Sequence, residues 1–305
     1  MFKSQVAPPH WRKIRRRLIL LGGLALIALG IAEAYLANSL VASANHPVGL
    51  PPTDMKVVAG TIPSKSGSNL ATWYIPADNS HATVILLHPI RSDRRAMFGR
   101  AKLLHDAGYS VLLIDFQAHG ESPGDHITIG CLESRDVRAA IDYARSLNPT
   151  HRIGIIGWSL GGAATLLASP LNIDAAVLEC VYPTLDEAVH NRVAMRLGSL
   201  SGIIAPVLLW QFQIRLGISP SELRPIDHIA DIGCPVLVAG GEFDKHTSLT
   251  ETQHLFDAAK EPKKLSIFRG ADHTDLLEQN HAQYEADILS FLDTYLAPRR
   301  ESQTQ

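Results

Sequence analysis

Short apolar runs recur along the chain from residue 56 onward, each separated from the next by a more polar stretch. Runs such as ATVILLH (82–88) and SVLLIDF (110–116) are nearly continuous, as expected of strands buried on both faces. Between the strands, 94–107 and 131–147 are predicted helices. The other predicted strands are 56–62, 70–76, 151–158, 175–180, 234–240 and 264–270, and the other predicted helices are 249–259 and 283–296. This alternation predicts an α/β fold with a mostly parallel sheet and helices on both faces.

The alternation stops between residues 182 and 232, where no strand pattern appears. Helical stretches such as SGIIAPVLLWQFQIRLGI dominate this segment, and we predict that it forms a helical lid inserted late in the domain. Residues 202–218 are apolar around most of the helix, which is typical of a helix packed over a site. The alternative is that this helix, including Leu209 and Trp210, contacts a membrane and admits acyl chains from it.

The chain begins with a different pattern, in which six basic residues precede a long apolar run with a single charge, Glu33. A span from Leu18 to Leu36 has about the twenty residues that a bilayer core requires. The next basic residue is Lys56, so the positive-inside bias places the N-terminus in the cytoplasm and the rest of the chain outside it. The six basic residues are Lys3, Arg12, Lys13, Arg15, Arg16 and Arg17.

Two alternatives to this anchor are open. A signal peptide cleaved after Ala32-Glu33-Ala34 or Ala42-Ser43-Ala44 would yield a secreted protein. A buried core helix is the other alternative, which the clustered positive charges disfavour. The predicted organisation is a basic cytoplasmic N-terminus (1–17), a transmembrane signal-anchor helix (18–37), a linker (38–55), an α/β domain (56–297) with its lid at about 182–232, and a polar tail (298–305).

Composition narrows the possible function classes. The 305 residues carry a net charge of −2 and show no basic stripe with interleaved aromatic residues, so we expect no nucleic-acid partner. Cys131, Cys180 and Cys234 lack the paired spacing of zinc or redox sites, and no His, Cys or carboxylate cluster has ligand spacing. We therefore expect no metal and no cofactor. No feature of the sequence indicates an oligomeric state.

The candidate nucleophile is Ser159, in the stretch IGIIGWSLGGAATLLA (153–168). Its five central residues, GWSLG (157–161), have the form small-x-Ser-x-small between an apolar strand and a small-residue helix. The glycines allow a tight, strained turn that lifts a serine oxygen above the edge of a sheet. An ordinary glycine-rich turn is the alternative, but the strand before and the helix after favour the nucleophile.

A serine hydroxyl needs a base, and the base needs an orienting acid. Asp244 and His273 each follow a predicted strand, in the loops where catalytic groups of open α/β sheets collect. We predict that His273 takes the Ser159 proton and that Asp244 holds the imidazole in the useful tautomer. The rivals for the acid are Glu242, Asp227 and Asp231, the rivals for the base are His246 and His281, and His119 and His126 are given no catalytic role.

An acyl-transfer site also needs donors for the oxyanion. One predicted donor is the backbone N–H of Leu160, just after the nucleophile at a helix N-terminus. The other comes from the loop after strand 82–88, where Pro89 has no N–H and Ile90 is the expected donor.

These motifs resemble the α/β-hydrolase superfamily of serine hydrolases, across residues 56–297. The resemblance rests on the segment 157–162, on Asp244 and His273 in that order, and on two further segments, His88-Pro89 and DFQAHGES (115–122). It implies the α/β-hydrolase fold, with an eight-stranded sheet whose second strand is antiparallel. It also implies hydrolysis of an ester, thioester or amide without a cofactor.

The resemblance has two departures. The segment DFQAHGES is similar to the family's D-x-R-G-H-G-x-S loop, with Gln117 and Ala118 where Arg and Gly are usual. His88-Pro89 likewise stands where His-Gly is common. Among subfamilies the chain looks closest to membrane-anchored serine hydrolases of the ABHD13/BEM46 type, including Pro225-Ile226-Asp227 before the seventh strand.

Three function classes follow from these expectations. The first is a carboxylesterase- or lipase-like serine hydrolase that acts on a small-molecule or lipid acyl ester or thioester through an acyl-enzyme. The second is a peptidase or amidase on the same fold, because the triad and the oxyanion hole are shared. The third is a non-catalytic binding protein, which the competent residues at all three triad positions disfavour.

Overall fold

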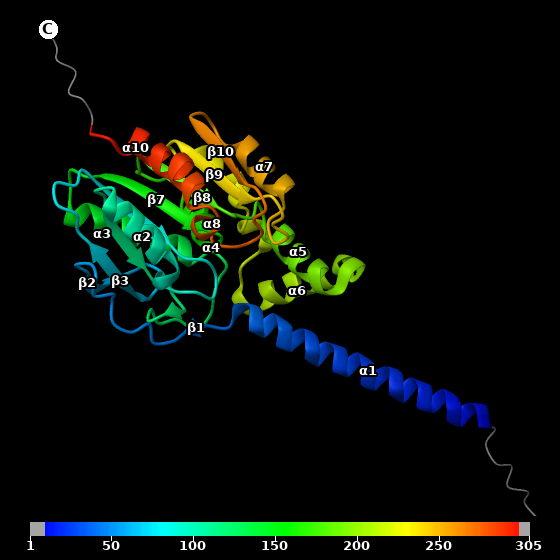
Figure 1. Ribbon diagram of the computed structural model, residues 1–305. Helices are drawn as coiled ribbons and strands as arrows, with labels where there is room; N and C mark the ends of the chain where they lie inside the picture. The colour runs from blue at the N-terminus through cyan, green and yellow to red at the C-terminus, as the bar shows by residue number, and fades with distance from the viewer. Residues whose placement is uncertain (1–9, 299–305) are drawn as a thin grey trace, which may run out of the picture. The chain divides into compact units, whose positions relative to one another are not determined.

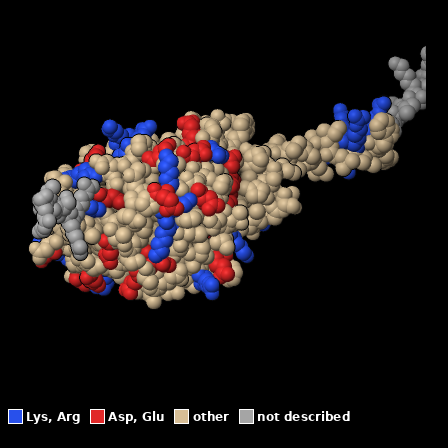
Figure 2. All heavy atoms as spheres, turned by 90° about the horizontal axis from the view of Figure 1, so that it is seen from above, with Lys and Arg blue, Asp and Glu red and all other residues tan. Residues whose placement is uncertain are grey.

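The computed structural model describes residues 10–298, which fall into two compact units divided between Leu40 and Val41 (Figure 1). The first unit holds most of α1 (His10–Val41). Its stretch His10–Tyr35 is long and apolar enough to cross a membrane by length and composition. Figure 2 shows basic side chains near the start of this helix and a stretch without visible charge after them. Residues 1–9 of the predicted basic N-terminus and 299–305 of the predicted tail lie outside the described residues.

Within the described residues, the second unit is built on an eight-stranded sheet of order β10-β9-β8-β7-β4-β5-β3-β2. β3 runs antiparallel to β2 and β5, and the other neighbouring pairs are parallel. The mostly parallel sheet and its antiparallel second strand are therefore confirmed. The strands are β2 (Val58–Pro63), β3 (Asn69–Ile75), β4 (Ala82–Leu87), β5 (Ser110–Ile114), β7 (Arg152–Trp158), β8 (Ala175–Glu179), β9 (Val236–Gly241) and β10 (Lys263–Phe268).

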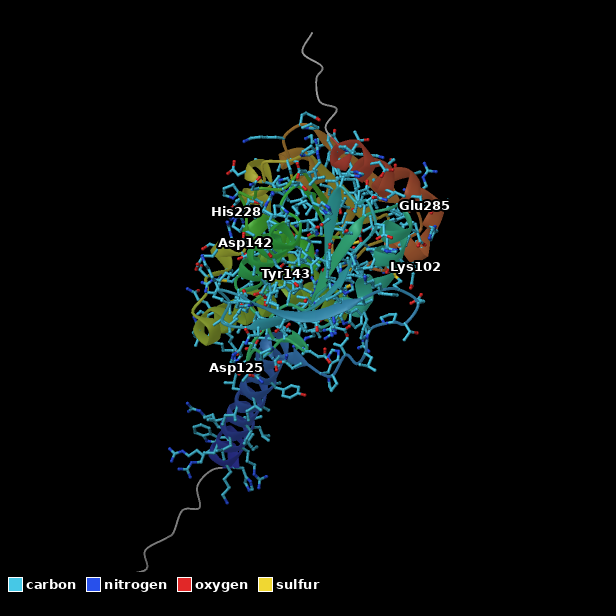
Figure 3. All side chains as sticks on the ribbon, turned by 90° about the vertical axis from the view of Figure 1, so that its left-hand side faces the viewer. Lys102, Asp125, Asp142, Tyr143, His228 and Glu285 are labelled. Carbon is cyan, nitrogen blue, oxygen red and sulfur yellow. The ribbon has the colours of Figure 1, made fainter. Side chains whose placement is uncertain are left out.

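Helices cover both faces of the sheet, as predicted. Ile85 and Leu87 of β4 face a core closed by α3, α4 and α7, whereas Val84 and Leu86 face a core closed by α2 and the C-terminal helices. Figure 3 shows the two sides through Lys102 of α2 and Tyr143 of α3. The helices are α2 (Phe98–Asp106), α3 (Glu133–Leu147), α4 (Leu160–Leu167), α7 (Leu249–Ala258), α8 (Leu276–Gln279), α9 (His281–Tyr284) and α10 (Ser290–Leu296).

The segment predicted as a lid contains two helices, α5 (Leu185–Leu197) and α6 (Ser201–Leu216), which pack against each other. Three 3₁₀ turns follow before β9 begins. Thr184 caps the start of α5 by accepting the Glu187 N–H, and Gly217 ends α6 in the left-handed conformation. Trp210 is exposed, but Leu209 is buried, so Leu209 cannot belong to an outward-facing surface of α6.

The chain after α1 is held closely by the second unit. β1 (Ala44–Asn45) pairs in parallel with β6 (His119–Gly120). The Val41 carbonyl accepts the Ile127 N–H at 2.8 Å, and the His46 N–H donates to the Gly120 carbonyl at 2.9 Å. The predicted linker at 38–55 is thus partly helical and partly a hydrogen-bonded strand.

Candidate active site

Ser159 is the residue between the end of β7 and the start of α4. Its φ of 51° lies in the region that L residues rarely adopt, and a positive φ of this kind costs about 1–3 kcal/mol. Two backbone hydrogen bonds hold the turn: the Ser159 N–H donates to the Glu179 carbonyl at 2.7 Å, and the Ser159 carbonyl accepts the Ala163 N–H at 3.0 Å. The strained strand-to-helix turn predicted from GWSLG is therefore present.

Close packing around this turn explains its glycines. A Cβ on Gly157 would lie 2.5 Å from the backbone nitrogen of Gly162, where it must clash. A Cβ on Gly161 would overlap the Leu87 carbonyl. Because Leu87 ends β4, the start of α4 lies directly against the end of the neighbouring strand. The Ser159 turn and the end of β4 are thereby held side by side.

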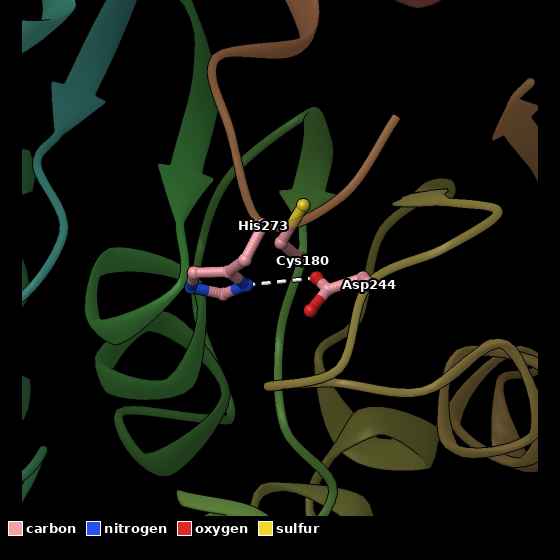
Figure 4. A group of neighbouring side chains, drawn as sticks. All are labelled: Cys180, Asp244 and His273. Atoms are coloured by element: carbon pink, nitrogen blue, oxygen red, sulfur yellow. Dashed lines mark hydrogen bonds and ion pairs between the residues drawn. The ribbon is translucent and has the colours of Figure 1, made fainter. Parts of the chain in front are cut away.

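Asp244 and His273 meet at the C-terminal ends of β9 and β10. Asp244 is buried, and its Oδ2 accepts the His273 Nδ1–H at 2.7 Å (Figure 4). Its Oδ1 accepts the backbone N–H groups of His246 at 2.7 Å and Thr247 at 2.9 Å. These bonds fix the carboxylate in the loop and leave one oxygen facing the imidazole.

The hydrogen bonds also keep Asp244 ionised. Burial raises the pKa of its carboxyl, but the hydrogen bond and charge of His273, with the N–H groups of Thr247 and His246, outweigh burial and hold the pKa below its ordinary value. An ionised carboxylate only accepts hydrogen bonds, so the proton in the pair sits on His273 Nδ1. In the neutral form of the imidazole, the other ring nitrogen, Nε2, is then a hydrogen-bond acceptor.

His273 and Ser159, the candidate nucleophile, are not joined directly. Among the described residues, no hydrogen bond joins the Ser159 hydroxyl to His273. In Figure 4 the rest of the His273 ring extends away from Asp244. Catalytic hydrogen bonds are often long without substrate and shorten in the reacting complex. The structure brings two of the three predicted residues into direct contact and places the third on a strained turn.

The two predicted oxyanion donors lie at the start of α4 and in the loop after β4. The Leu160 N–H opens α4, and Ile90 lies in the loop after β4. His88 holds this loop, because its Nδ1–H donates to the Pro89 carbonyl at 2.8 Å and its Nε2 accepts the Phe116 N–H at 3.0 Å. Complete burial lowers the pKa of His88 to about 3, which keeps it neutral and able to accept. The roles of Leu160 and Ile90 stay predictions.

The rival acids and bases have other partners. Glu242 accepts the Gly270 N–H, Asp227 pairs with Arg224, and Asp231 pairs with Lys260. His281 is exposed and lies 3.4 Å from Glu285, whereas the His246 ring lies 4.7 Å from the His273 ring, centre to centre. His246 is therefore a neighbour of the candidate base that sequence reasoning treated solely as its competitor.

A buried network that the sequence did not reveal lies behind the nucleophile turn. Arg100 of α2 donates to the Glu179 carboxylate at 2.6 Å and to Asp275 at 2.7 Å, and it lies 5.1 Å from the centre of the Trp158 ring. Burial works against its charge, but the field of Glu179 outweighs burial and holds the pKa of Arg100 well above its ordinary value. The Glu179 backbone also accepts the Ser159 N–H, so this network joins the nucleophile turn to the loop that carries His273.

Cys180, Asp244 and His273 place one potential metal-ligand atom each within 4.8 Å of the others (Figure 4). A cysteine binds a metal as the thiolate. Burial raises the pKa of Cys180 well above its ordinary value, and the Asp244 and Glu179 carboxylates raise it further. The three residues therefore fit a neutral thiol beside an ionised carboxylate–imidazole pair better than a metal centre.

The comparison with known families agrees with this geometry. The sequence model of the alpha/beta hydrolase family matches residues 84–286, which include the Ser159 turn, Asp244 and His273. The chain belongs to the alpha/beta hydrolase family. This assignment supports hydrolase activity.

Similar proteins occur in several organisms. An uncharacterized protein of Bacillus subtilis, YqkD, is 24% identical over 92% of this chain and 98% of its own length. The uncharacterized protein Rv2307c of Mycobacterium tuberculosis is 30% identical over 70% of this chain and 71% of its own. Among solved structures, the Pyrococcus furiosus esterase Pf2001 aligns with a TM-score of 0.69 at 22% identity, covering 84% of this chain and 98% of that one.

The two departures in the segment 115–122 have local explanations. Gln117, in place of the usual arginine, donates to the buried Glu133 carboxylate at 2.7 Å and to the His126 carbonyl at 2.9 Å. Ala118 has a φ of 57°, which explains why glycine is common at this position of alpha/beta hydrolases. The Gln117 amide therefore ties this loop to α3 and to His126.

Proposed function

We propose that the protein is a serine hydrolase of the carboxylesterase or lipase type that cleaves an ester or thioester. Ser159 is the nucleophile, His273 the general base and acid, and Asp244 the residue that orients the imidazole. The N–H groups of Leu160 and Ile90 form the oxyanion hole. The observation that carries the proposal is the 2.7 Å hydrogen bond between Asp244 and His273, together with a serine held at positive φ between β7 and α4.

The proposed reaction proceeds through an acyl-enzyme. His273 Nε2 takes the Ser159 proton as the serine oxygen attacks the carbonyl carbon, and the two N–H groups stabilise the oxyanion. The tetrahedral intermediate collapses, and His273 passes the proton to the departing alkoxide or thiolate. Water, deprotonated by His273, then attacks the acyl carbon. The bond from that carbon to the Ser159 oxygen breaks, His273 returns the proton to the serine, and the acid is released. Asp244 stays ionised throughout, and its low pKa suits that role.

An active-site-directed fluorophosphonate tests this assignment. We expect it to label the full-length protein, and we expect no label on Ser159→Ala. Ser146→Ala is the matched control, because Ser146 lies on the exposed surface of α3 and should not affect labelling. Labelling that survives in Ser159→Ala would refute the nucleophile.

The substrate class needs a separate measurement. Comparing kcat/KM over p-nitrophenyl esters of increasing acyl length with aminoacyl amides would define it. We expect ester cleavage to dominate. Faster cleavage of the amides would favour a peptidase instead.

We further propose that α1 anchors the protein in the membrane, with the N-terminus in the cytoplasm and the hydrolase domain outside it, as in membrane-anchored relatives of this fold. The apolar stretch His10–Tyr35 supports this role. Protease added to intact cells that express the full chain should degrade the domain. A tag placed before residue 10 should stay protected and attached. Loss of that tag by cleavage would favour a secreted protein.

The helices α5 and α6 are the proposed lid. Asn191 of α5 donates from Nδ2 to the His246 carbonyl at 3.2 Å and to the Glu251 carboxylate at 2.8 Å. Because His246 also lies against His273, α5 is fixed at the edge of the site. A lid in this place would select substrates by the width of the access it leaves.

A further inference from the structure

One face of α6 is apolar and uncovered. Ile203, Trp210 and Ile214 are 71%, 62% and 63% exposed, and their spacing places them along one side of the helix. The opposite side, with Leu208 and Phe212, is buried. No charged side chain occurs in α6 before Arg215. An exposed stripe of this size on a helix whose other side is already packed indicates a surface that meets an apolar partner.

The short segment 36–41, the tether between α1 and the hydrolase domain, indicates that this partner is the lipid bilayer. If α1 spans the bilayer up to Tyr35, residues 36–41 reach at most about 20 Å even when fully extended. At Val41 the chain is already hydrogen-bonded to Ile127, and Ala42 pairs with His126. The hydrolase domain therefore has no long spacer and is confined to the neighbourhood of the membrane surface.

The tether joins the hydrolase domain near the C-terminal end of α6. A surface cleft of about 700 Å³ is lined by His126 together with Arg215, Leu216 and Ile218. Since His126 pairs with Ala42, the point where the chain departs and the C-terminal end of α6 border one cleft. The C-terminal end of α6 therefore lies near Ala42, from which residues 36–41 lead back to α1.

We propose that the face of α6 formed by Ile203, Trp210 and Ile214 rests in the lipid surface and delivers lipid acyl esters to the site. The hairpin partner α5 is bound to the His246 loop, so the same two-helix unit touches both the membrane and the candidate active site. The lipid contact rests on the proposed membrane anchor, whereas the delivery of substrate rests also on the proposed hydrolase activity.

Spin labels on the full chain in phosphatidylcholine–phosphatidylglycerol vesicles test the contact. Nitroxides are attached to Ile203→Cys and Trp210→Cys, with Leu147→Cys on α3 as an exposed control, after Cys131 and Cys234 are changed to alanine. Collision with oxygen, which concentrates in lipid, is compared with collision with a water-soluble nickel chelate. We expect the α6 labels to favour oxygen over nickel about tenfold more than the control does.

Two results would overturn the contact. Nickel access at the α6 labels equal to that at residue 147 would place the helix in water. Protection from both reagents would mean that protein covers the face, either a second copy of this chain or another partner.

Delivery of substrate is tested with Trp210→Ser/Ile214→Ser. We expect kcat/KM to fall about tenfold for a long-chain ester held in vesicles and to stay unchanged for a soluble acetyl ester, because two apolar contacts with lipid are lost. An equal loss on both esters, or no loss on either, would refute delivery. A wild-type protein without esterase activity would refute the proposed function and leave the spin-label result standing.

Discussion

Replacing Arg100 by methionine probes the charged interior behind the site. Arg100 and Glu179 have no exposed surface, and Arg100 donates to both Glu179 oxygens. Without the guanidinium, the hydroxyl of Tyr284 is the remaining described side-chain partner of that carboxylate. An ionised group left unpaired in the interior costs about 3–5 kcal/mol. We expect Arg100→Met to lose that much free energy of unfolding in urea titrations of the detergent-solubilised full chain.

A triple variant separates charge burial from loss of packing. Arg100→Met/Glu179→Met/Tyr284→Phe removes the guanidinium, the Glu179 carboxylate and the hydroxyl that bonds it. The Asp275 side chain is 17% exposed, so water can still solvate its carboxylate, and it still caps the start of α8. Replacing a buried ion pair by apolar side chains is often neutral or stabilising, so the triple variant should recover most of the loss. A loss below about 1 kcal/mol in Arg100→Met, or no recovery in the triple variant, would refute the assignment of the cost to an unpaired carboxylate.

Activity gives the second readout of the same variants. Arg100 joins the strand end whose carbonyl holds the Ser159 N–H to the loop of His273. Misplacement by about 1 Å can lower a rate by about a hundredfold, so we expect kcat of the triple variant to fall about 10–100-fold with KM little changed. A triple variant that is stable and has full kcat would show that the network supports the fold without positioning the site.

Three further substitutions follow from the contacts at single positions. Asp244→Asn should lower kcat about 10³–10⁴-fold with little change in KM, because the imidazole loses its preferred tautomer, and an unchanged kcat would refute the orienting role. Burial raises the pKa of Asp136 to about 7 from its ordinary 3.8. The folded state therefore binds this proton more tightly than the unfolded chain, and the free energy of unfolding falls as the pH rises from about 4 to about 7. Asp136→Asn should reduce the difference in unfolding free energy between urea titrations at about pH 4.5 and about pH 7.5. An unchanged difference would show that Asp136 does not cause it. Gly157→Ala should cost about 1–3 kcal/mol of unfolding free energy, whereas Gly202→Ala, whose Cβ would meet nothing within 4 Å, should be neutral or stabilising by up to about 1 kcal/mol.

The strands could be predicted because burial on both faces produces uninterrupted apolar runs. Every residue of β4, β5 and β8 is buried, and the predicted runs differ from these strands only at their ends. Helix ends were harder to predict. The chain from Arg94 begins as a 3₁₀ turn capped by Asp93, and the C-terminal helix predicted at 283–296 is a series of short helices that starts at Leu276. Side-chain caps decide such boundaries, and they leave only a weak signal in the apolar pattern.

The candidate site likewise contains residues that the sequence could predict and residues that it could not. The positions of Ser159, Asp244 and His273 could be predicted because each follows a strand, and parallel strands bring their C-terminal ends to one edge. Their catalytic roles stay predictions. The Arg100–Glu179 pair could not be predicted, since its members are 79 positions apart and neither belongs to a motif. A lone carboxylate at the end of the apolar strand AAVLE was the one available signal, and it does not identify its partner.

Backbone strain marks the same edge of the sheet. Arg91, Ala118, Ser159 and Cys180 have φ between 51° and 58°, and they follow β4, β5, β7 and β8, which are four adjacent strands. A left-handed conformation is unfavourable for such residues by about 1–2 kcal/mol each, so the strands beneath must hold these turns in place. The two packed cores on either side of the sheet supply that rigidity. Strain collected at one edge is therefore an independent reason to locate the chemistry there, since residues in sparsely populated conformations cluster at active sites.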